Sequence, residues 1–185
     1  MKNKAIVFID GSNFYFKLKE SAYKIGKKYS LLKFRFRDFC EWLIEEKELV
    51  DIRYYVGAVR RQNNNEKSET MYANQQKLIG KLQQQNVSIT LGELIQHPDK
   101  SYHEKGVDVR IAVEMIRFAR ENKYDVAYLL SSDTDLVPAV EEVRAFGKKV
   151  TYVGFPKGQS FGLSKTANDV FLLRMEEIEK FLKLT

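Results

Sequence analysis

The sequence contains a single cysteine, Cys40, among its 185 residues. One cysteine excludes an intramolecular disulfide framework and any zinc site built from several thiolates. Only two histidines are present, His97 and His103, and both lie in a polar stretch. This scarcity argues against a Ser-His-Asp triad and against a histidine-rich metal centre. We expect Cys40 to be a buried core residue.

Long apolar runs are also missing. No apolar segment approaches the roughly 20 residues that a membrane span needs, and "MKNKAIVFIDG" reaches an aspartate before the apolar part of a secretory signal could form. We therefore expect a soluble, cytoplasmic protein that does not contact a membrane. With 44% hydrophobic residues, the chain is long enough for one domain of ordinary size, which we expect over residues 1–185.

The glycine motifs that cradle phosphates are absent as well. No G-x-G-x-x-G follows "IVFID", and "GFPKGQSFG" lacks the Gly-Lys-Ser/Thr ending of a P-loop. A haloacid-dehalogenase-like phosphatase would begin with a strand that ends in aspartate, as this chain does at Asp10. It would need a second aspartate two residues later, where this sequence has Ser12.

Positive charge is concentrated near the N-terminus. The whole chain carries a formal charge of +6, and residues 14–39 combine many lysines and arginines with many aromatic residues. Basic groups interleaved with aromatics can bind phosphates and stack with bases; alternatively, the charges form an ordinary solvated surface and the aromatics fill the core. Candidate phosphate contacts in this segment are Lys24, Lys27 and Lys28.

Strand and helix patterns alternate along the chain. Short β-branched or aromatic runs predict strands at 5–9, 51–59, 87–94, 125–130, 149–155 and 169–174. Helical spacing of apolar residues predicts helices at 35–49, 69–85, 106–123 and 135–147, and residues 60–69 and 92–106 are expected to be exposed loops. Alternation with nearly continuous apolar strands indicates an α/β fold, a three-layer α/β/α sandwich around a mostly parallel sheet.

Four aspartates are expected at one edge of this sheet. Asp10 follows the first strand, Asp133 and Asp135 follow the strand at 125–130, and Asp108 opens a helix on its inward face. Taken singly, Asp10 and Asp133 could be turn residues, and Asp108 and Asp135 could cap helix N-termini or complement the helix dipole. Four converging carboxylates would repel one another without a cation, so their convergence predicts Mg²⁺ or Mn²⁺.

The sequence contains three notable blocks, "FIDGSNFY", "KGVDVRIAVEM" and "LLSSDTDLVPAVEEVRAFGKKVTYVGF". In sequence and order these blocks resemble the signature of NYN domains in the PIN-like nuclease superfamily, particularly the LabA-like branch. The resemblance covers roughly residues 4 to 173. It implies a PIN-like sandwich and metal-dependent ribonuclease chemistry, with the four aspartates at the family's acidic positions. Many members have glycine where this chain has Ser132 and Thr134. "SFGLSKTANDVF" resembles the family's closing pattern, where we expect Asp169 to be structural.

The resemblance also includes Asn13, whose amide could orient a metal-bound water or a phosphate oxygen; a helix N-cap is the alternative role. Our leading hypothesis is a Mg²⁺- or Mn²⁺-dependent endoribonuclease acting on single-stranded or unpaired RNA. Ser12 and Lys105 join the candidate substrate contacts. A non-catalytic RNA-binding or regulatory protein and a phosphohydrolase of small nucleotides are alternatives, and homo-oligomerisation is left open.

Overall fold

The computed structural model describes residues 2–24, 30–61, 66–96 and 102–182. Its centre is a seven-stranded sheet in the order β4-β3-β2-β1-β5-β6-β7. Each pair of neighbours is parallel except β3 and β4, which are antiparallel. The predicted mostly parallel sheet is therefore confirmed. The strands are β1 (Lys4–Asp10), β2 (Glu48–Ala58), β3 (Ser88–Gln96), β4 (Tyr102–Lys105), β5 (Val126–Leu130), β6 (Lys149–Gly154) and β7 (Asp169–Leu172).

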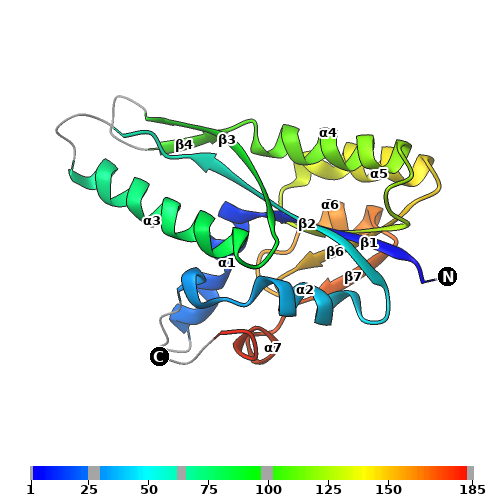
Figure 1. Ribbon diagram of the computed structural model, residues 1–185. Coiled ribbons are helices and arrows are strands. Elements are labelled where there is room, and N and C mark those ends of the chain that lie inside the picture. The colour runs from blue at the N-terminus through cyan, green and yellow to red at the C-terminus, as the bar shows by residue number, and fades with distance from the viewer. Residues whose placement is uncertain (1, 25–29, 62–65, 97–101, 183–185) are drawn as a thin grey trace.

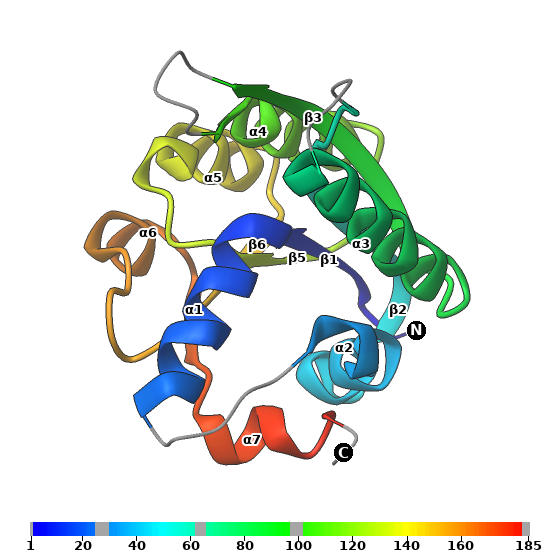
Figure 2. The same ribbon diagram turned by 90° about the vertical axis from the view of Figure 1, so that its left-hand side faces the viewer.

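Helices cover both faces of this sheet (Figure 1). One face carries α1 (Gly11–Lys24), α2 (Phe36–Ile44), α3 (Glu66–Gln83) and α7 (Met175–Glu179). The other face carries α4 (Val107–Arg120), α5 (Val137–Ala145) and α6 (Phe161–Thr166). Two 3₁₀ turns, η1 (Leu31–Lys33) and η2 (Thr134–Leu136), complete the described elements. Figure 2 shows the two helical layers on either side of the sheet, as an α/β/α sandwich requires.

The alternation of side chains along β1 separates two hydrophobic cores. Ala5, Val7 and Ile9 face the core beneath α1 and α2, whereas Ile6 and Phe8 face the core beneath α4 and α5. All five are buried because β1 is the middle strand of a sheet covered on both sides. The same alternation directs Asp10, the last residue of β1, towards the side of α4 and α5.

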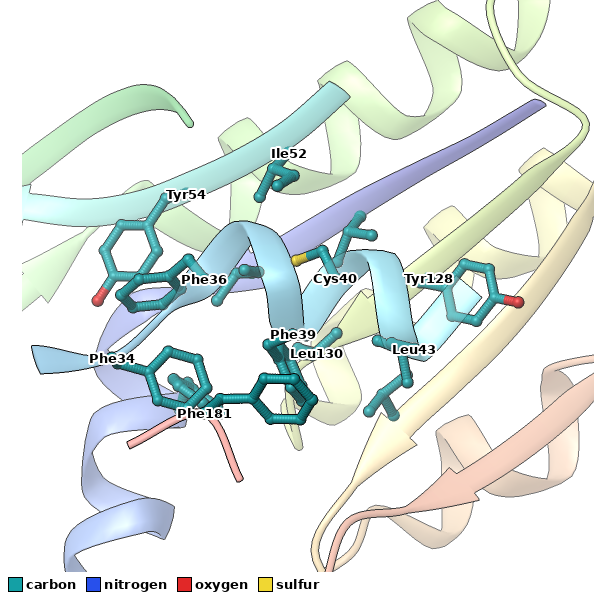
Figure 3. Packing of buried hydrophobic residues seen from close by; sticks show 14 of the residues in the cluster. Phe34, Phe36, Phe39, Cys40, Leu43, Ile52, Tyr54, Tyr128, Leu130 and Phe181 are labelled. Carbon is teal, nitrogen blue, oxygen red and sulfur yellow. The ribbon is translucent and has the colours of Figure 1, made fainter. Parts of the chain in front are cut away.

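Aromatic side chains dominate the core beneath α1 and α2. Phe34, Phe36, Phe39 and Phe181 lie against one another with ring centroids 4.7–6.5 Å apart (Figure 3). Cys40 is fully buried beside them, and burial raises the pKa of its thiol far above the usual range. The expectation that Cys40 is a core residue is confirmed.

A polar network fastens α4 to the sheet. Arg53 on β2 donates from Nε and Nη2 to Glu114 Oε2 of α4, at 3.1 and 2.6 Å. Tyr55 donates its hydroxyl to the same carboxylate oxygen at 2.7 Å. These contacts hold the helix that carries Asp108 at a fixed position over β2.

Several elements differ from the sequence-based expectations. Helix α1 begins directly after Asp10, where the sequence indicated only a turn. The expected loop at 92–106 is wrong in part, because β3 runs to Gln96 and β4 forms within it. The expected loop at 60–69 is wrong for Glu66–Glu69, which form the first turn of α3, and α6 and α7 were not anticipated. No helix within the described ranges is long and apolar enough to cross a bilayer.

Candidate active site

Three aspartates meet where the loop after β5 passes the beginning of α4. Asp108 lies in the first turn of α4, Asp133 precedes η2, and Asp135 lies within η2. Each offers a carboxylate oxygen, and these oxygens all lie within 4.8 Å of one another. Asp108 and Asp133 are half-buried, while Asp135 is exposed. The carboxyl end of β5 thus supplies two of the three groups, as its parallel direction predicts.

Two of these carboxylates, those of Asp108 and Asp135, cap no helix, although Asp108 lies in the first turn of α4, where its charge complements the helix dipole. Helix α4 begins after Gly106 without a side-chain cap, and α5 begins after Leu136, likewise without one. Among the described residues, no donor bonds to the Asp108 or Asp135 carboxylate. The helix-cap alternative for these two residues is therefore wrong. Asp133 does cap η2, because its Oδ1 accepts the backbone N–H of Asp135 at 3.0 Å.

Asp10 lies beside this group but outside the set of oxygens within 4.8 Å. Its side chain is 8% exposed. Oδ1 accepts the Asn13 backbone N–H at 3.0 Å, and Oδ2 accepts the Ser131 hydroxyl at 3.0 Å. Burial, reinforced by the nearby charges of Glu104 and Asp133, raises the pKa of Asp10 to about 6. The structure thus brings together three of the four predicted aspartates and places the fourth next to them.

The Asn13 side chain links α1 to the loop after β5. Its Oδ1 accepts the backbone N–H of Ser132 at 3.2 Å, and the Asp133 backbone N–H donates to Ser131 Oγ at 3.1 Å. Asp10, and not Asn13, caps the first turn of α1. The N-cap alternative for Asn13 is therefore wrong, and its amide instead fixes the loop that carries the aspartates.

Glu104 is an acidic neighbour that the sequence did not reveal. It lies on β4 and its Oε2 accepts the Ser12 hydroxyl at 2.8 Å and the Gly57 backbone N–H at 2.6 Å. These partners are 92 and 47 residues away in the sequence. Only the pairing of β4 with β3 brings Glu104 to this edge, and a short "YHEK" segment carries no local signal of that pairing.

The structure describes only some of the lysines that were predicted to contact the substrate. Lys105 ends β4 with an exposed side chain. Lys27 and Lys28 lie outside the described residues, as does the side chain of Lys24. The aromatic residues of the same segment divide into two groups: phenylalanines 14, 34, 36 and 39 fill the core, whereas Tyr15 and Phe16 of α1 are exposed.

The sequence of residues 4–174 matches the NYN domain family. The chain belongs to the NYN domain family. Among solved structures, this NYN domain resembles a protein of unknown function, VPA0982 from Vibrio parahaemolyticus RIMD 2210633, with 26% identity, a TM-score of 0.69 and coverage of 98% of this chain and 96% of the other.

A second structure, a UDP-N-acetylglucosamine 2-epimerase (putative in its description) from Listeria monocytogenes, is far more distant. It shares 11% identity over 98% of this chain and 42% of its own, with a TM-score of 0.44. Comparison with curated proteins finds no match. The family assignment therefore rests on the NYN match, and NYN domains are PIN-like nucleases.

The acidic group of this NYN domain fits a divalent cation. All the ligand atoms are carboxylate oxygens, which hard cations such as Mg²⁺ and Mn²⁺ prefer. No lysine or arginine within the described ranges forms an ion pair with Asp10, Asp108, Asp133 or Asp135. Neighbouring carboxylates without a protein cation repel one another, and a bound metal ion would relieve that repulsion.

Proposed function

We propose that this NYN domain is a divalent-metal-dependent endoribonuclease that hydrolyses phosphodiester bonds in single-stranded or unpaired RNA. The observation that carries the proposal is the group formed by Asp108, Asp133 and Asp135, whose oxygens converge without an ion pair to any lysine or arginine that the structure describes. Membership of a nuclease family supports the same reaction class. A cytoplasmic location stays a prediction from the sequence.

Asp108, Asp133 and Asp135 are the residues that would hold Mg²⁺ or Mn²⁺. When bound, the metal supplies positive charge that polarises the scissile phosphate and lowers the pKa of water. Asn13 and Ser131 keep the loop after β5 in place, because both bond to backbone N–H groups of that loop. The backbone of the loop that carries Asp133 and Asp135 is thus fixed before substrate arrives, which favours catalysis by preorganisation.

Asp10 has a different environment and supports a second role. In the metal-free protein the pKa of Asp10 is about 6, so its carboxylate is mostly ionised at neutral pH and is free to accept a proton from an attacking water. Its two oxygens are held by Asn13 and Ser131, so the group cannot rotate freely. It also adds a fourth negative charge at the edge where a cation would bind.

Cleavage of a 5′-labelled single-stranded RNA by the purified protein tests the proposal. We expect cleavage with Mg²⁺ or Mn²⁺ and none in EDTA. Asp133→Asn should reduce the rate by about a hundredfold or more, because asparagine keeps the η2 cap but removes a ligand charge. Asp169→Asn is the matched control, since this exposed aspartate begins β7 at the opposite edge of the sheet.

The outcomes separate the candidate functions. Undiminished cleavage by Asp133→Asn, or equal loss in Asp169→Asn, would contradict the assignment of the site. Intact RNA after incubation of a well-folded wild type with both metals would contradict nuclease activity itself. Turnover of mononucleotides in preference to oligonucleotides would contradict RNA as the substrate.

A further inference from the structure

A pocket of about 690 Å³ lies between α1 and α3, beside the acidic edge. Helix α3 explains why the space is open. Of its 18 residues, only Ser68 and Leu82 are buried. Met71, Gln75 and Leu78 lie on one face of the helix and line the pocket half-buried. Leu78 also packs against the core beneath α1 and α2, whereas Met71 and Gln75 border a hollow large enough for a small ligand.

One wall of the pocket is shared with the candidate active site. Gly11 and Ser12, which follow Asp10 directly in the chain, line the pocket, and so does Glu104. Glu104 accepts the hydroxyl of Ser12, which fixes the junction between the two sites. If the phosphate of a nucleotide contacted the aspartates, the base of that nucleotide could therefore reach this pocket.

The chemistry of the lining favours a flat, uncharged ring. Most lining side chains are apolar or aromatic, and among the described residues that line the pocket there is no lysine or arginine. Because Glu104 is the one acidic residue of that lining, a phosphate would be repelled. Tyr15 and Phe16 stand at the side of α1 with 40% and 64% of their surface exposed, available for stacking with a base.

Glu104 adds selectivity for a hydrogen-bond donor. A carboxylate has about four acceptor positions, and the two bonds from Ser12 and Gly57 both end on Oε2. The Glu104 carboxylate can therefore accept further hydrogen bonds. An exocyclic amino group would supply such a bond, as the N4 amino group of cytosine does when it donates to a carboxylate. The Gln75 amide already bonds to Gly57 O at the end of β2 and to the N–H of Val59 just after it, so it has a structural role.

We propose that the pocket between α1 and α3 binds an unpaired nucleobase of the RNA strand and prefers an amino-bearing base to uracil. The proposal rests on the proposed ribonuclease function, to which it adds a substrate preference. Cytosine and uracil provide the sharpest comparison, because they share one ring and differ by an amino donor at C4 in place of a carbonyl acceptor.

Binding is measured by fluorescence anisotropy with labelled 12-mers of cytidylate and uridylate, with Ca²⁺ in place of Mg²⁺ and the length of the RNA checked on a gel. We expect the cytidylate to bind about tenfold more tightly, the effect of one good carboxylate–amino contact. Glu104→Gln should abolish or invert this ratio. The glutamine oxygen can keep the bonds from Ser12 and Gly57, and its NH₂ then offers a donor where the carboxylate offered an acceptor.

Filling the pocket provides a second, independent variant. Met71→Trp should weaken binding of both oligonucleotides by roughly tenfold, the contribution of a single stacked base. Gln76→Trp is the control, because Gln76 is exposed on the same helix and is not part of the pocket lining. Thermal melting of each variant shows whether it is folded before binding is compared.

The results distinguish this proposal from the proposed function. Equal affinity for the two oligonucleotides, or a Met71→Trp variant that binds like Gln76→Trp, would overturn the base pocket even if the protein cleaves RNA. A cytidylate preference that depends on Glu104 and Met71 would support the pocket even if no cleavage occurs. Failure to bind either oligonucleotide would overturn both proposals.

Discussion

Replacing Asp10 by asparagine should stabilise the metal-free protein at alkaline pH. The buried carboxyl has a pKa of about 6, against an ordinary value of 3.8. Between these values the folded state binds more protons than the unfolded state, so the contribution of Asp10 to stability is fully present below pH 3.8 and is lost as the pH rises through 6. The total loss is about 3 kcal/mol.

The asparagine variant removes this loss at the expense of one hydrogen bond. Its amide can accept from Asn13 N–H or from the Ser131 hydroxyl, but its NH₂ then faces the other donor. An imperfect bond costs about 1 kcal/mol, so the net gain above pH 8 is about 2 kcal/mol. The cost of the imperfect hydrogen bond does not depend on pH. It therefore cancels when the change in unfolding free energy between two pH values is compared for the variant and the wild type.

Urea denaturation in EDTA at pH 5 and pH 8 measures the effect. Of the 3 kcal/mol, about half is lost between these two values. With an m-value of about 2 kcal/mol per molar urea, the wild-type midpoint should fall by about 0.7 M more than that of Asp10→Asn. Both proteins contain the same two histidines, so their titration is common to both. Asp169→Asn, at an exposed site, should follow the wild type.

Parallel pH dependence in the wild type and Asp10→Asn would refute the reasoning, because it would mean that the buried carboxyl has an ordinary pKa. Manganese gives a further check at pH 8. If Asp10 takes part in metal binding, a concentration of 100 times the dissociation constant stabilises the wild type by about 2.7 kcal/mol. The variant should gain less.

Three further predictions concern the site and its supports. In EDTA, Asp135→Asn should melt no lower than the wild type, because it relieves repulsion and removes no helix cap; a clear loss would favour a structural role. Glu114→Ala should lower the free energy of unfolding by about 2 to 3 kcal/mol in urea, since it removes the carboxylate that accepts from both Arg53 and Tyr55 and leaves Arg53 with the longer contact to Asp51. Gly11→Ala should lower the melting temperature measured by calorimetry, because its Cβ would lie 2.4 Å from a buried tyrosine ring. Gly80→Ala should raise the melting temperature slightly, because its Cβ would meet no neighbouring residue within 4 Å.

The sequence predicted the parallel strands well because their signals are local. "AIVFI" and "DVAYLL" are continuous apolar runs, as expected for strands covered on both faces, and both lie in the middle of the sheet. Helix α1 was harder to predict. Phe14 and Leu18 are its buried apolar residues, and the surrounding lysines and exposed aromatics obscure the helical period. Strand β4 depends on pairing with β3, which four residues of local sequence cannot encode.

The candidate site shows the same division between local and long-range information. The rule that parallel strands end at a common edge was enough to place Asp10, Asp133 and Asp135 near one another. It did not distinguish the buried Asp10, held by Asn13 and Ser131, from the three carboxylates that converge. That distinction depends on side-chain bonds between segments more than a hundred residues apart. The position of Glu104 likewise depends on bonds to distant residues, 92 and 47 positions away.

The fold alone does not explain why β1 ends on a carboxylate. An asparagine at position 10 could cap α1 equally well, because Asn and Asp are similar N-cap residues. Burial makes the charged form unfavourable, and the neighbouring charges of Glu104 and Asp133 make it more so. A group that is costly for folding and replaceable as a cap is best explained by the chemistry of the edge where it lies. There the negative charge that destabilises the metal-free protein would attract a cation or accept a proton during the reaction.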